Sequence, residues 1–291
     1  MEKKLIVCAD DFGLTCGVNK GIIDCYKYGI LKSASVLANG PAFEDALKLS
    51  SKFPGLDLGI HLFLTEFKPI CLNPHGKLID SDGSFFNKYI KIIKEIVKYP
   101  GIIEQIKAEF RCQIECVLEK GIKLSHINSH KHLHIYPSIW KIVLELAQEY
   151  KIPFVRFPVE NIYRFWQIVL TNNANKEFKE QLTFVAFCMF FRVRFSNWKK
   201  MNGTIKSPDN FCGLFDTGNL NELTLSGILN GLGSGVTELM CHPGYVDNEL
   251  LRMSTRLLES REKEVAALCH SGVKKIINDN NIKVTSFHEC Y

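Results

Sequence analysis

The feature that most constrains the fold is the alternation of short β-rich runs with helical stretches along most of the 291 residues. The β-rich runs lie at 4–9, 33–38, 57–62, 123–128, 153–157, 236–241 and 282–287. Repeated βα units of this kind favour a parallel sheet covered by helices. We therefore expect an α/β fold, a nearly complete (β/α) barrel of about seven parallel strands.

Helical spacing of apolar residues places the intervening helices. Val18, Ile22, Ile23 and Tyr26 predict a helix after the first strand, with Gly29 ending it in a left-handed conformation. Pro137 is suited to open another helix, and Ser254 to cap one that runs through Leu268. The segment 84–120 predicts two more.

Residues 160–215 interrupt this alternation with many aromatic side chains and interleaved basic residues. We interpret the segment as a helical insertion that either packs over the barrel mouth or contacts a second subunit in a homodimer. An ordinary helical core is the competing interpretation. Without a repeat, low-complexity tract or linker, we expect residues 1–291 to form one domain.

Composition excludes several classes of function. The net charge of +5 and pI of about 8.5 are mild, and the lysines are scattered, so nucleic acid is not an expected partner. The longest apolar run, 184–191, is too short to span a bilayer, so we expect no integral membrane segment. The start of the chain has no signal-peptide pattern, so we expect a cytoplasmic protein with its 11 cysteines reduced. The glycine-rich stretch 231–235 precedes a strand, unlike a dinucleotide fingerprint, and predicts a turn.

Polar residues gather where the expected strands end, which is where barrel enzymes place their catalytic groups. Those residues are Asp10, Asp11, Asn39, His61, Asn128, Arg156, His242 and Tyr245, together with the histidines that follow Asn128. Two adjacent carboxylates in one partly buried site require a cation or a shared proton. One of them bound to a divalent ion and the other free to accept a proton would satisfy this requirement. Because strand neighbours point to opposite faces, a turn after Ala9 is needed to bring both aspartates to the ion.

Four histidines occupy even positions between His126 and His134, and in an extended segment they would line one side. Taken singly, each site residue has an ordinary structural explanation: a turn or helix cap for the aspartates, and core or turn packing for His61 and His242. Spacing alone does not choose among His126, His130, His132 and His134 as a metal ligand.

The motifs together resemble the YdjC-like carbohydrate deacetylase family, which includes chitooligosaccharide deacetylases. The matching stretches are Ala9–Thr15 with Gly17–Asn19 and Gly21–Ile22, Gly59–Leu62 with Leu64–Glu66, His126–His134 with Pro137, Arg156 before Pro158, and Glu238–Tyr245. The resemblance runs from residue 5 to about 287 and is weakest across 160–215. It implies an irregular (β/α) barrel that holds one divalent ion, Mg or Zn, with Asp11, His61 and His130 as its ligands. It also implies that Asp10 is the base and His242 the acid. Asn128 departs from the family pattern, in which we expect Asp to be common.

The resemblance implies a hydrolase that removes the acetyl group from an N-acetylated amino sugar and releases acetate. Such a reaction requires water activation, oxyanion stabilisation and protonation of the departing amine. Arg156, Asn39 and Tyr245 are the candidate substrate-binding residues. Two alternatives are a metal-dependent phosphoesterase and a non-catalytic sugar-binding protein on the same barrel.

Overall fold

The computed structural model describes residues 2–71, 76–160 and 204–290. Its strands are β1 Lys3–Phe12, β2 Ser33–Val36, β3 Asp57–Leu62, β4 His126–Ser129, β5 Phe154–Val155, β6 Asn210–Cys212, β7 Gly235–Cys241 and β8 Ile282–Thr285. The helices are α1 Cys16–Tyr28, α2 Phe43–Lys52, α3 Tyr89–Lys98, α4 Ile102–Leu118, α5 Pro137–Glu149, α8 Glu222–Asn230, α9 Asn248–Arg252, α10 Glu259–Cys269 and α11 Ser271–Asp279. Short 3-10 turns cover His130–Ile135 and His288–Cys290.

The strands form one eight-stranded curled sheet in the order β5-β4-β3-β2-β1-β7-β6, with β8 also paired to β1. All strand pairings in this sheet are parallel. Two isolated parallel bridges, Phe154 to Lys206 and Glu160 to Phe211, connect the two ends of the strand order. The expected irregular (β/α) barrel is confirmed, and each of the seven expected strands is present. The prediction missed β6, which lies inside the segment interpreted as an insertion.

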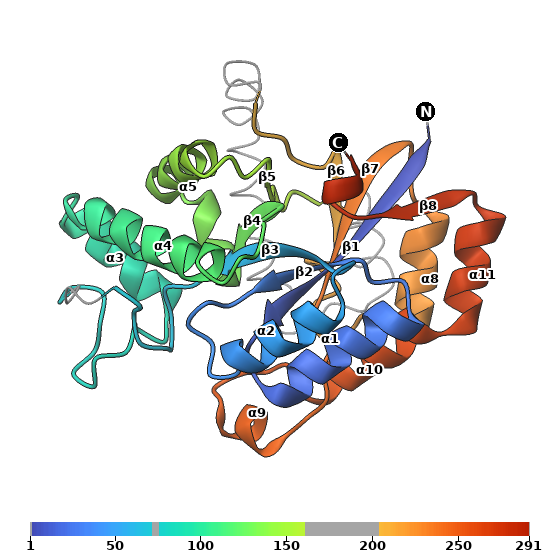
Figure 1. Ribbon diagram of the computed structural model, residues 1–291, viewed down its shortest axis with the longest axis horizontal. Helices are drawn as coiled ribbons and strands as arrows, with labels where there is room; N and C mark the ends of the chain where they lie inside the picture. The colour runs from blue at the N-terminus through green and yellow to red at the C-terminus, as the bar shows by residue number, and fades with distance from the viewer. Residues whose placement is uncertain (1, 72–75, 161–203, 291) are drawn as a thin grey trace.

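The barrel is irregular because β2 and β8 share one edge of β1. Lys3–Ile6 of β1 pair with β8, whereas Cys8–Phe12 pair with β2. Helices cover the outside of the sheet: α1 packs against α2 and α10, α8 packs against α10 and α11, and α4 packs against α5 (Figure 1).

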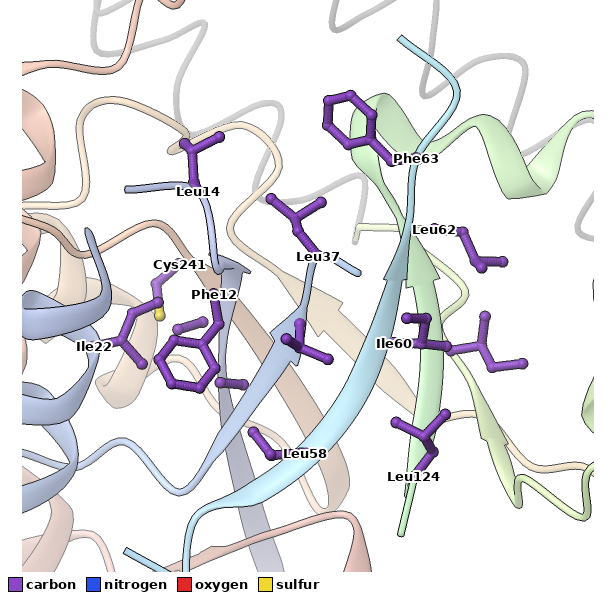
Figure 2. Close-up of a cluster of buried hydrophobic side chains, with 14 of the residues drawn as sticks. Phe12, Leu14, Ile22, Leu37, Leu58, Ile60, Leu62, Phe63, Leu124 and Cys241 are labelled. Carbon is purple, nitrogen blue, oxygen red and sulfur yellow. The ribbon is translucent and has the colours of Figure 1, made fainter. Parts of the chain in front are cut away.

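Strand alternation divides the core into two layers. Leu5, Val7 and Ala9 of β1 belong to the large apolar cluster between sheet and helices, whereas Ile6 and Cys8 belong to a small cluster inside the barrel with Phe154 and Phe287. Figure 2 shows side chains of the outer cluster, including Phe12, Ile22 and, along β3, Leu58, Ile60 and Leu62. Side chains alternate between the two faces along each strand. Asp10 on β1 and His61 on β3 alternate with residues of the outer cluster, so both face the inside of the barrel.

Most of the expected helices are present, and two details of the expectation are wrong. Gly29 has φ −111° and not a left-handed conformation; a Cβ there would lie 2.6 Å from the Cys25 carbonyl oxygen and 2.7 Å from that of Leu268. Close packing of α1 on α10 therefore explains this glycine. Ser254 does not cap a helix, because Asp247 caps α9 and α10 begins only at Glu259. The turn expected at 231–235 is confirmed, with Gly231 ending α8 and Gly235 at φ +98°.

The expected lid or subunit contact falls mainly on residues 161–203, which lie outside the described residues. The homodimer, the single domain and the cytoplasmic location stay predictions. In the described part of the chain, no helix combines the length and apolarity needed to cross a membrane.

Candidate active site

A bulge in β1 brings both aspartates to the same end of the barrel. The pairing of β1 with β2 shifts register between Ala9 and Phe12, and Asp11 within this shift has φ +67°. A bulge of this kind turns one residue away from regular alternation. The turn expected after Ala9 is thus built into the strand itself, and both carboxylates, each only 2% exposed, line one pocket.

Asp11, His61 and His130 converge from three segments of the chain. Their ligand atoms all lie within 4.8 Å of one another. Asp11 Oδ1 is 3.5 Å from His61 Nε2 and 3.5 Å from His130 Nδ1. Two ligands about 2.1 Å from a tetrahedral zinc ion would be separated by about 3.4 Å, so these distances suit ligands of one ion.

The carboxylate of Asp11 also fits a bound cation. Its Oδ1 atom is buried and has no hydrogen-bond partner among the described residues. Native proteins rarely leave a buried carboxylate oxygen unsatisfied. Burial raises the pKa of Asp11, but Arg261 and then His130 outweigh it and hold the pKa well below the ordinary value. Asp11 is therefore ionised, as a metal ligand must be.

Asn128 determines which ring nitrogen of His61 carries the proton. The Nδ1–H of His61 donates to Asn128 Oδ1 at 2.6 Å, which leaves the Nε2 lone pair facing Asp11. Asn128 Nδ2 in turn donates to Asp10 Oδ1 at 3.2 Å and to Ser35 Oγ at 3.1 Å. An amide is suited to this position because it accepts from an imidazole and donates to a carboxylate, which an ionised Asp does not.

The histidine run does not stay extended beyond Ser129, which corrects the expectation that all four histidines line one side. Lys131 and His132 have φ of +53° and +51°, so the chain turns sharply after His130. His130 stacks on Phe63 with ring centroids 4.6 Å apart.

The other three histidines have different surroundings. His126 lies deeper in the barrel against Phe287, and His134 bonds the Arg156 carbonyl oxygen at 2.9 Å. His132 lines the pocket but is not in the ligand cluster. The turn after His130 therefore separates one histidine of the run from the rest.

Asp10 is held by a buried arginine. Arg156 donates from Nη1 to Asp10 Oδ2 at 2.6 Å and from Nη2 to Asp10 Oδ1 at 2.8 Å, and its Nε donates to Glu238 at 2.6 Å. Burial raises the pKa of Asp10, but Arg156, His61 and His242 together outweigh this effect, and the pKa lies well below its ordinary value.

His242 follows β7 and lines the same pocket as the two aspartates. Its backbone N–H donates to Glu264 Oε2 at 2.5 Å. Burial lowers the pKa of His242 to about 4, although Asp11 and Asp10 oppose this shift. The neutral imidazole is therefore the main form at pH 7, and the side chain must gain a proton before it can serve as the acid expected from the sequence.

A family model for YdjC-like proteins matches residues 4–279. The chain belongs to the YdjC-like protein family. Relatives named carbohydrate deacetylase from Thermoanaerobacter pseudethanolicus and Brevibacillus brevis are each 31% identical over 287 residues, covering 98% of this chain and 98% and 99% of theirs. A solved structure from Enterococcus faecalis, described as a cellobiose-phosphate cleavage protein, superposes with a TM-score of 0.76 at 26% identity. It covers 100% of this chain and 99% of its own.

The three residues expected to bind the sugar all have partners within this YdjC-like protein. Arg156 is fully buried beneath Asp10, where it positions that carboxylate. Asn39 donates to the Lys68 carbonyl oxygen at 3.4 Å, and the Tyr245 hydroxyl donates to Asp24 at 3.0 Å. None of the three is among the described residues that line the pocket.

The pocket has a volume of about 400 Å³, within the usual range for a small-molecule site. Phe63 and Tyr89 contribute aromatic surface, and Glu66 and Lys131 form an ion pair of 2.6 Å among the lining residues. A wall of aromatic side chains and paired charges suits a ligand with both apolar faces and hydroxyl groups.

Sequence reasoning missed two buried charged residues of this YdjC-like protein, Arg261 and Glu264. Both lie on α10 and are only 1% exposed. They occur at helical spacing with Leu257, Val265 and Leu268, so they sit in the apolar stripe of the helix. A charged pair within such a stripe was the available signal.

Proposed function

We propose that this chain is a metal-dependent hydrolase that removes the acetyl group from an N-acetylated amino sugar or chitooligosaccharide and releases acetate. The observation that carries the proposal is the unpartnered, buried Asp11 Oδ1 facing two imidazole nitrogens at 3.5 Å, in a pocket that Asp10 and His242 also line. The relatives named carbohydrate deacetylase support the sugar as substrate.

Asp11, His61 and His130 are the proposed ligands of one divalent ion. When bound, the ion supplies Lewis acidity toward the amide carbonyl and lowers the pKa of water. Two nitrogen donors and one carboxylate favour zinc over magnesium, because magnesium prefers an all-oxygen shell.

Two side chains of the pocket are proposed to move protons. Asp10 accepts a proton from the attacking water, and His242 gives one to the sugar nitrogen as the C–N bond breaks. Water thus loses one proton and the amine gains one. The proton that Asp10 takes up passes through solvent to the neutral His242 before His242 donates it, so both residues end the cycle in their starting forms. Arg156 keeps the carboxylate of Asp10 ionised and oriented between these steps.

A metal-dependent phosphoesterase is the second candidate, because carboxylates and histidines on barrels also serve phosphate chemistry. Phosphoesterases of this kind often use two ions about 3.5–4 Å apart. In the described part of the chain, only Asp11, His61 and His130 form a group that suits an ion. This single cluster favours amide hydrolysis.

The test is acetate release from a panel of N-acetylated mono- and oligosaccharides, with p-nitrophenyl phosphate as the competing substrate. Metal-stripped protein is assayed first, and Zn, Mg, Mn or Co is then returned. We expect acetate release that depends on the added metal and is strongest with a transition metal. Phosphate release without acetate release would refute the proposal, as would full activity after the metal is removed and kept absent.

A further inference from the structure

The two oxygens of Asp11 have different surroundings. Oδ1 faces His61 and His130, whereas Oδ2 accepts a hydrogen bond from Arg261 Nη2 at 2.6 Å. Both side chains of this ion pair are 2% exposed. The carboxylate therefore lies between the guanidinium on one side and the proposed metal position on the other.

Arg261 also contacts two backbone segments of the pocket. Its Nε donates to the Leu257 carbonyl oxygen at 3.2 Å, and its Nη1 lies 3.5 Å from the carbonyl oxygen of His242. A Cβ on Gly244 would lie 3.3 Å from Arg261 Cδ, so the loop after His242 packs directly on this side chain. One guanidinium thus connects the aspartate, the loop that carries His242, and the end of the 253–257 segment that lines the pocket.

The helix α10 supports this arrangement one turn further on. Glu264 accepts the backbone N–H of His242, so two residues of one helix face hold the same loop. Arg261 lies in the first turn of α10, and its position is fixed by the packing of this helix against α1.

The bulge turns Asp11 toward the pocket, but the backbone alone does not fix how its carboxylate rotates about the side-chain bonds. A planar guanidinium with nitrogens pointing in three directions holds a carboxylate and two carbonyls at once, which a lysine ammonium on a flexible stem does not. Partners behind metal ligands commonly change metal affinity by about 10- to 100-fold.

We infer that Arg261 is the positioning residue of the metal site: it turns Asp11 so that Oδ1 faces His61 and His130, and it links this ligand to the His242 loop. The inference rests on the proposed metal function. Metal affinity would then depend on α10 as well as on the residues at the strand ends.

The test measures Co²⁺ binding to metal-stripped full-length protein by calorimetry, together with the visible absorption of the bound Co²⁺. Arg261→Met and Arg261→Lys are compared with wild type and with Lys263→Met, an exposed position on the same helix. We expect both Arg261 variants to raise the Kd for Co²⁺ by about 10- to 100-fold and to change the absorption bands, with Lys263→Met unchanged. Thermal melting of each variant reports folding separately.

If Arg261→Met does not fold, Arg261→Lys, which keeps the buried positive charge, decides the question. Folded Arg261 variants with a lowered Tm but wild-type Kd and absorption would overturn the inference and leave the residue a purely structural role. Wild-type protein that binds no Co²⁺ would instead refute the metal site, and the inference with it.

Discussion

Replacing Asp10 by asparagine separates the proposed base from its neighbour, the proposed ligand Asp11. Asparagine keeps the shape of the side chain and removes its ability to accept a proton. We expect Asp10→Asn to retain most of the bound metal while the rate of acetate release falls by about 100-fold or more.

The structure adds a cost in stability to this prediction. Asp10 accepts hydrogen bonds from Arg156 through both oxygens, and from Ser35 at 3.1 Å and Asn128 at 3.2 Å. In the variant the amide N–H groups face a donor of the fully buried Arg156, which keeps only Glu238 as a charged partner.

Breaking a buried ion pair commonly costs about 3–5 kcal/mol. Because Glu238 still pairs with Arg156 in the variant, we expect a loss of about 3 kcal/mol. At about 2–4 °C per kcal/mol for a large domain, Tm should fall by about 6–12 °C. The variant should therefore still be folded at 25 °C, where its rate is compared with that of wild type.

The assay combines elemental analysis, acetate release at saturating substrate and thermal melting. Ser35→Ala is the matched control, because it removes the hydrogen bonds of Ser35 to Asp10 and Asn128 and leaves the carboxylate of Asp10 and its arginine. The control should lose about 1 kcal/mol of stability and keep its rate within tenfold of wild type. Asp10 is not the base if Asp10→Asn stays nearly fully active or loses its metal as completely as an Asp11 variant does, and a Tm equal to that of wild type would contradict the buried ion pair.

Asp11→Asn should lose metal and activity together while keeping the bulge, because asparagine tolerates a φ of +67°; stoichiometric metal in the purified variant would contradict the ligand assignment. Burial raises the pKa of Glu264 from 4.5 to about 7, so the folded protein binds this proton more tightly than the unfolded chain does. The stabilisation that comes from this tighter proton binding by Glu264 is fully present below pH 4.5 and is lost as the pH rises to 7. The difference in free energy of unfolding between wild type and Glu264→Gln, measured by urea titration, should thus fall by about 3 kcal/mol across that window, and a pH-independent difference would count against it. Gly59→Ala should destabilise the barrel by about 1–3 kcal/mol because its Cβ would lie 2.5 Å from the His126 ring, and an unchanged Tm would show that the inside of the barrel is less tightly packed.

The sequence predicted the strands with strong local patterns and missed one that lacks such a pattern. The first strand is a continuous apolar run, so its position was evident, whereas β6 is only Asn210–Cys212 inside an aromatic-rich stretch. A strand of three residues is defined by its neighbours: β6 pairs with Thr237–Leu239 of β7. Propensity within so short a segment carries little information.

The candidate site shows the same division. The sequence placed Asp10, Asp11, His61 and His242 at strand ends, because strand ends follow from local periodicity. It did not reveal that Arg156 lies beneath Asp10, since a strand-end arginine has the same local pattern whether it faces a ligand or a buried carboxylate.

The sequence by itself determined the α/β class, the strand order along the chain, the membership in a family, and the residue types of the site. These follow from apolar periodicity and from motifs that are contiguous in the chain. Only the tertiary structure decided that Asp11 is turned by a bulge and that a left-handed turn after His130 separates it from the later histidines. It also decided that Arg261, 250 positions further along the chain, bonds to Asp11. The physical reason is that bulges, left-handed turns and buried ion pairs are stabilised by contacts between segments far apart in the chain, which no local pattern records.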